Sequence, residues 1–150
     1  MRLLNFALIL SIALGIAAYA HWIRRPKATT DLSGLPTIPA TDVPLLRLAD
    51  ARALHADPAT LFVDVRSASD FSFGRIAGAV SLPEEEIEKR LPELRSRLEH
   101  AKAIVVYCGS RDCGKSLWGA LRLRQAGFAQ TSIFPGGWNE WYVDSAPIDR

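Results

Sequence analysis

Two cysteines lie five positions apart in the segment CGSRDCGKS. Cys108 directly follows the apolar run AIVVY, which is typical of a buried strand, and Cys113 lies in the loop after it. A cysteine attacks as its thiolate, so its reactivity depends on neighbouring groups that stabilise negative charge. This arrangement indicates nucleophilic sulfur chemistry at the end of a strand.

The residues after Cys108 supply that stabilisation. The loop leads into a predicted helix at 116–126, and the N-terminal end of a helix and successive backbone N–H groups favour an anion. Arg111 and Lys115 add positive charge. We therefore predict Cys108 as the nucleophile, with a buried structural cysteine as the alternative. The predicted anion-binding loop comprises Gly109, Ser110, Arg111, Asp112, Gly114, Lys115 and Ser116.

The same loop matches the phosphate-loop pattern G-x-x-x-x-G-K-[ST] of nucleotide-binding proteins at positions 109–116. Such folds also need an aspartate that organises magnesium at the end of a later strand. The only later strand signal is SIF, followed by PGG, and it carries no acid. The sequence therefore disfavours nucleotide binding.

The elements that must position this loop alternate between strand and helix. The short apolar runs LFVDV, AIVVY and SIF predict buried strands. Helices are predicted at 46–56, at 83–101 with a break at Pro92, and at 116–126 with Gly127 as the cap. Shorter helical turns are predicted at 67–74 and 139–143. This order indicates an α/β fold with a mainly parallel sheet.

Three ordered motifs carry a family resemblance. They are LFVDVRSASDFSFGRIAGAVSLP, then AIVVYC with its loop and helix, then the turn FPGGW. Together they cover about positions 44–148 and resemble rhodanese-like sulfurtransferases. The resemblance implies a three-layer α/β sandwich with a mainly parallel central sheet. The matching residues of the first motif are Asp64, Arg66, Phe71, Gly74, Ile76, Gly78, Ala79 and Pro83.

The resemblance also implies a reaction. The Cys108 thiolate would attack the outer sulfur of a small donor such as thiosulfate, become a persulfide, and pass that sulfur to a thiol or to cyanide. The acceptor thiol can belong to a protein. Asp64 and Arg66 would brace the loop as a salt-bridged pair rather than react. No cofactor is implied.

The active loop departs from the family pattern C-x-x-G-x-R-S. It is two residues longer before Ser116, and Lys115 stands in place of the closing arginine. Lysine is a point charge, whereas arginine offers a planar fork for an anion. Arg75 also replaces the common histidine of the first motif. Two alternatives therefore stay open: a phosphatase- or arsenate-reductase-type enzyme using the same cysteine, and a non-catalytic docking module.

Cys113 adds a second thiol to the loop. It can resolve a persulfide or a sulfenate on Cys108 and so form a disulfide, which in an oxidising compartment would be the resting state. Cys113 can instead be the reactive thiol, because it lies closer to the predicted helix. The position of Cys108 at the strand end favours Cys108 as the nucleophile.

The chain begins with an uncharged apolar block at positions 3–20. We predict residues 1–25 to be a transmembrane anchor or a signal segment, with an anchor favoured by the aromatic and basic residues that follow the block. Residues 26–43 form a predicted linker and 44–150 the rhodanese-like domain. We therefore expect a single-pass membrane protein whose domain lies on the extracytoplasmic, periplasmic side of the membrane.

The placement of the charged residues and of the histidines argues against nucleic-acid binding and metal binding. Four of the 18 basic residues and none of the 16 acidic residues lie in the first 27 positions, so the remainder is slightly acidic. A nucleic-acid surface would need basic residues clustered on the folded part, and we predict no nucleic-acid partner. His21, His55 and His100 are scattered and form no metal-ligand pattern. We predict no metal site.

Overall fold

The computed structural model describes residues 42–150. The predicted anchor or signal segment at 1–25 and nearly all of the predicted linker lie outside the described residues. Between 42 and 150, no helix is both long and apolar enough to cross a membrane.

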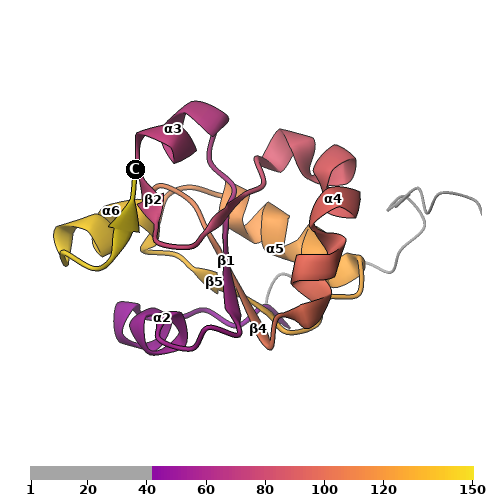
Figure 1. The fold of residues 1–150 in the computed structure, drawn as a ribbon, viewed down its shortest axis with the longest axis horizontal. Helices are drawn as coiled ribbons and strands as arrows, with labels where there is room; N and C mark the ends of the chain where they lie inside the picture. The colour runs from indigo at the N-terminus through magenta and orange to yellow at the C-terminus, as the bar shows by residue number, and fades with distance from the viewer. Residues whose placement is uncertain (1–41) are drawn as a thin grey trace, which may run out of the picture.

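A four-stranded parallel sheet forms the centre of the described part (Figure 1). Its strands are β3 (Val80–Ser81), β1 (Thr60–Asp64), β4 (Ala103–Tyr107) and β5 (Thr131–Phe134), in that spatial order. Every pairing in this sheet is parallel. The three predicted strands are confirmed, and the buried apolar runs that predicted them are typical of a sheet covered on both faces.

Helices cover both faces of this sheet, which gives three layers (Figure 1). The helices α4 (Ile87–His100) and α5 (Lys115–Gln125) pack on one face, and α2 (Leu48–His55) and α6 (Gly137–Val143) on the other. Alternate residues of each strand point to opposite faces, so each layer has its own apolar core. The predicted α/β fold with a mainly parallel central sheet is confirmed.

The helix α4 runs without a break through Pro92, where the sequence predicted an interruption. Proline removes one backbone hydrogen bond from a helix interior. Ile87, Leu91 and Leu98 on the same helix are buried against the sheet, and Pro92 itself is exposed. Packing of the apolar face therefore maintains the helix across the proline, after a short 3-10 turn at Glu84–Glu86.

A second, two-stranded sheet was not predicted. It pairs β2 (Arg75–Ile76) with β6 (Ile148–Asp149) in antiparallel orientation. Strands of two residues are too short to show a periodic pattern, so only their long-range pairing reveals them. This sheet joins the segment after α3 (Ala68–Phe73) to the C-terminal end of the chain.

The register of the central sheet brings the motif residues together. Asp64 at the end of β1 lies beside Tyr107 at the end of β4, and the Val65 N–H donates to the Tyr107 carbonyl oxygen at 3.1 Å. Parallel strands end at the same edge of a sheet, so Arg66 and Cys108 follow at that edge. This edge carries the candidate site.

Candidate functional site

Cys108 is the first residue after β4, and its side chain is almost fully buried, with 4% of its surface exposed. Strand alternation turns it toward the layer of α4 and α5, where it packs with Val106 and Ala120. A reactant must therefore approach it from the loop side of the sheet edge.

Cys108 and Cys113 form a disulfide within the loop. Their Cα atoms are 6.2 Å apart, and a turn closed by the Cys113 N–H and the Ser110 carbonyl oxygen, at 3.1 Å, brings Cys113 back toward the strand end. Cys113 is only partly buried and so is the more exposed of the two cysteines. The structure thus contains the loop in its oxidised form.

The closing turn of the chain braces the start of the loop. The Trp138 N–H donates to the Cys108 carbonyl oxygen at 2.8 Å, and the Asn139 N–H donates to the Gly109 carbonyl oxygen at 2.9 Å. Gly137 has φ 59°, and a Cβ there would meet the Cys108 carbonyl group. A glycine is needed at this position both for its backbone conformation and for the close approach of the two segments.

The charged residues of the loop make exposed ion pairs. An Arg111 Nη donates to a Glu140 Oε at 2.6 Å, and the Lys115 Nζ lies 3.6 Å from a Glu85 Oε. Exposed pairs of this kind contribute little free energy, so both cations can turn to an incoming anion at small cost.

The backbone of the loop offers further donors. Within residues 42–150, the N–H groups of Gly109, Ser110, Arg111 and Asp112 donate no hydrogen bond. Gly114 caps the start of α5, and the Ser116 hydroxyl donates weakly to the Cys113 carbonyl oxygen at 3.4 Å. Free N–H groups ahead of a helix start are the elements of an anion cradle.

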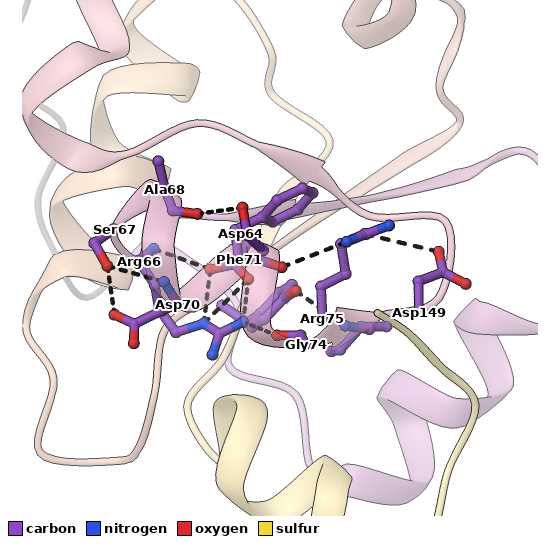
Figure 2. Close-up of polar contacts among 12 residues, drawn as sticks. Asp64, Arg66, Ser67, Ala68, Asp70, Phe71, Gly74, Arg75 and Asp149 are labelled. Atoms are coloured by element: carbon purple, nitrogen blue, oxygen red, sulfur yellow. Dashed lines mark hydrogen bonds and ion pairs between the residues drawn. The ribbon is translucent and has the colours of Figure 1, made fainter.

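Asp64 and Arg66 form a buried, bidentate salt bridge (Figure 2). The Arg66 guanidinium also donates to the Gly74 carbonyl oxygen at 2.7 Å and lies 4.9 Å from the ring centroid of Trp138. Burial opposes the positive charge of Arg66, but the hydrogen bonds and charge of Asp64 outweigh it and raise the pKa of the guanidinium. Arg66 thus links β1, the start of β2 and the closing turn.

Tyr107 connects β4 to the second sheet from the opposite face. Its buried hydroxyl accepts a hydrogen bond from the Ile76 N–H at 3.2 Å. Burial, together with the negative charge of Asp64, raises the pKa of the Tyr107 phenol well above its ordinary value. The phenol therefore stays neutral and acts in support of the fold.

Arg75, which stands in place of the family's common histidine, has a structural environment of its own. Its guanidinium lies 4.8 Å from the ring centroid of Phe71 and 3.9 Å from an Asp149 carboxylate oxygen (Figure 2). These contacts tie α3 to β6 and are separate from the loop.

An open cavity of about 350 Å³ lies at the sheet edge and contains both cysteines. Its lining residues are Arg66, Ser67, Asp70, Phe73, Cys108, Gly109, Cys113, Lys115, Trp138 and Asn139. A larger hollow of about 510 Å³ lies at the other end of the strands, near Thr60 and His100, and contains no cysteine. The smaller cavity is the candidate active site because it combines a nucleophile position with cations.

The sequence located the loop but missed parts of its surroundings. Cys108, Gly109, Cys113, Lys115 and Arg66 all line the cavity. Asp64 lies behind Arg66 and is held by it, so it is not available to organise magnesium for a nucleotide. Between residues 42 and 150 no cluster of His, Cys, Asp or Glu could hold a metal ion.

The missed contributors come from α3, with Ser67, Asp70 and Phe73 at the cavity, and from the closing turn. Trp138 was part of the motif FPGGW, which identified the turn but not its contacts with the loop. Asn139 and Glu140 follow that motif and lie in the predicted helical turn at 139–143, but no pattern indicated their contacts with the loop. Their contacts with Gly109 and Arg111 join positions about 30 residues apart.

Comparison with known proteins identifies the family and the fold. The rhodanese-like domain family matches residues 48–144. The rhodanese-like domain of the Alr3790 protein from Anabaena has a TM-score of 0.60 and 27% identity, covering 71% of this chain and 78% of that chain. The BH2092 protein of Bacillus halodurans, at 21% identity and a TM-score of 0.61, shares the fold over 90% of this chain and 85% of its own.

Curated relatives share sequence with one part of a longer protein. The tRNA uridine(34) hydroxylase of Sodalis glossinidius is 32% identical over 137 residues, and the one from Salmonella typhimurium is equally similar. In both cases the match covers 85% of this chain but only 38% of the relative. The chain thus spans well under half of the length of these hydroxylases.

Proposed function

Because the chain belongs to the rhodanese-like domain family, we propose that it is a sulfurtransferase or persulfide carrier that moves sulfane sulfur through Cys108. The observation that carries this proposal is that Cys108 lines the cavity and is followed by a loop with free N–H donors. A thiolate and an anionic persulfide are both stabilised by such donors.

The proposed reaction has two steps. The Cys108 thiolate attacks the outer sulfur of a donor such as thiosulfate, a sulfur–sulfur bond forms, and sulfite leaves with the electron pair of the bond that breaks. A nucleophilic acceptor, cyanide or a thiol, then attacks the outer sulfur of the persulfide. The Cys108 thiolate is released and is ready for another cycle.

Lys115 and the loop backbone are proposed to hold the donor anion. Lys115 lines the cavity and is the first residue of α5. Arg66 lines the same cavity but is committed to Asp64, so its proposed role is to hold the shape of the site. No cofactor takes part in either step.

The oxidised loop must be reduced before the first step, because a disulfide offers no thiolate. We propose that reduction by a thiol precedes sulfur loading. We also propose that residues 1–25 tether the domain to a membrane, on its extracytoplasmic side, which would expose the loop to an oxidising compartment.

A loading experiment tests this function. The full chain in detergent is reduced with a dithiol, freed of reductant, and given thiosulfate or a small persulfide. Mass spectrometry should find one added sulfur atom, transient in wild type and lasting in Cys113→Ser, and cyanide should convert that sulfur to thiocyanate. Cys108→Ser should abolish both signals, whereas Cys113→Ser should retain them. If no cysteine carries an added sulfur with either donor, sulfur transfer is the wrong function.

The longer loop favours one second candidate, a phosphatase- or arsenate-reductase-type activity at the same cysteine. Two extra residues widen the ring of N–H donors, and a tetrahedral oxyanion needs more donors than a single sulfur atom does. Turnover of an aryl phosphate or arsenate that depends on Cys108, without added sulfur, would support this candidate. An intact fold with unreactive cysteines would instead support a docking module.

The hydroxylation of tRNA named for the curated relatives is not part of the proposal. It belongs to proteins of which this chain spans 38%. The part of the chain after position 27 carries slightly more acidic than basic residues, which is unfavourable for binding a polyanion.

A further inference from the structure

We propose that Cys113 resolves the persulfide of Cys108, so that the protein releases hydrosulfide and consumes a dithiol. This inference rests on the proposed function, because it takes the Cys108 persulfide as its starting species. Its structural basis is the bond between the two cysteine sulfur atoms, which shows that the loop brings them within reach.

The first step is intramolecular. The Cys113 thiolate attacks the inner sulfur, which is the Sγ of Cys108, and the outer sulfur leaves as hydrosulfide with the bonding electron pair. The product is the Cys108–Cys113 disulfide that the structure contains. Attack on the outer sulfur would only move the persulfide to Cys113 and would form no disulfide. The bonded pair places the Cys113 sulfur next to the Sγ of Cys108, so the loop geometry is compatible with attack on the inner sulfur.

The second step restores the loop and needs a dithiol as co-reactant. One thiolate of the dithiol attacks the disulfide, and the second thiol displaces the resulting mixed disulfide, so the dithiol becomes a disulfide and both cysteines are reduced. Cys113 is the expected point of attack, because this residue is partly exposed whereas Cys108 is 4% exposed. Attack at Cys113 also releases Cys108 as the thiolate, which is the form that starts the next loading step.

The surroundings of the cavity are compatible with both steps. Lys115 lines the cavity beside Cys113 and places a positive charge where hydrosulfide leaves. Arg111, which pairs with Glu140, does not line this cavity, so Lys115 is the loop cation that lines it. The net reaction converts a sulfane sulfur and a dithiol into hydrosulfide and a disulfide, with atoms and electrons balanced.

A single-turnover experiment with the full chain tests the inference. The reduced protein is loaded with a sulfane sulfur donor, the excess donor is removed, and hydrosulfide and free thiols are followed without any external thiol. Wild type should release one hydrosulfide for each persulfide and lose both thiols. Cys113→Ser should keep its persulfide and release hydrosulfide at least about tenfold more slowly, because the attack has lost its high effective concentration.

Adding dithiothreitol should then restore both thiols of wild type and allow a second loading. A compound with a single thiol, added to the oxidised protein, should form a mixed disulfide with Cys113 rather than with Cys108. A persulfide that lasts as long in wild type as in Cys113→Ser overturns the inference, while transfer of the same sulfur to cyanide still upholds the proposed function. If neither protein ever carries sulfur, both proposals fall.

Discussion

At the scale of single residues, the site depends on a buried charge pair that does not react. Asp64 is fully buried and Arg66 is 8% exposed, and their hydrogen bonds to each other and to Gly74 compensate for the loss of water. A buried ion pair contributes little more to folding stability than an apolar replacement would. Removing one partner, however, leaves an isolated buried charge and lowers stability strongly. The pair therefore matters most for holding Arg66 against Trp138 at the wall of the cavity.

Asp64→Asn should lower the free energy of unfolding by about 3 kcal/mol, because Arg66 would remain buried and charged without its counter-ion. Urea unfolding followed by tryptophan fluorescence measures this change. The matched control is Glu99→Gln, which makes the same carboxyl-to-amide change in the exposed pair with Arg95 and should alter stability very little. Equal effects from both variants would contradict this account of Asp64.

At the scale of elements, the active loop depends on a turn that lies about 30 positions later in the chain. The loop after β4 and the start of α6 approach so closely that the Trp138 and Asn139 N–H groups bond to the carbonyl oxygens of Cys108 and Gly109. The approach needs a residue without a side chain at Gly137. The closing G-G-W turn thus determines where Cys108 lies, although it supplies no reacting group.

Gly137→Ala should separate the loop from α6, and should lower both stability and persulfide loading. Gly127→Ala is a matched control, because Gly127 also has a positive φ of 102° but a Cβ there would meet no atom within 4 Å. The control should lose about 1 kcal/mol from backbone strain alone. Gly137→Ala should lose clearly more, measured by urea unfolding, and its yield of labile sulfur should fall. Equal losses in both variants would show that the close approach is unimportant.

At the scale of the whole molecule, the described part forms one layered α/β unit that begins close to position 42. Val43 is buried in the core, and Leu45 pairs with Ile133 at the edge of β5. The N-terminal 41 residues lie outside the described part, so the predicted anchor stays a prediction. The α/β unit and the predicted anchor can be tested separately, because a cut before position 42 leaves the contacts of Val43 and Leu45 intact.

A fragment of residues 42–150 should unfold cooperatively at the same melting temperature as the full chain, because its core contacts begin at Val43. The full chain should partition into lipid vesicles, whereas the fragment should stay in the aqueous phase. Flotation of both proteins on the same vesicles measures the difference. Recovery of the full chain in the aqueous phase would contradict a retained anchor, and a product cleaved near position 20 would support a signal segment instead.

Local sequence patterns were enough to predict the class of fold, the strands that flank the loop, and the position of Cys108 at a strand end. These features follow from local patterns, since apolar runs and helix signals depend on residues close together in the chain. The Asp64–Arg66 pair was also anticipated, because the two residues are separated by one position.

The surroundings of the two cysteines, in contrast, depend on long-range packing of the folded chain. The disulfide, the bracing of Cys108 by Trp138, and the pairing of Arg111 with Glu140 depend on how the loop folds and on how α6 packs beside β4. The last two contacts join segments about 30 positions apart, and no local pattern encodes them. The sequence left Cys113 with several roles, and the folded loop favours one of them because it brings the sulfur of Cys113 into bonding contact with that of Cys108.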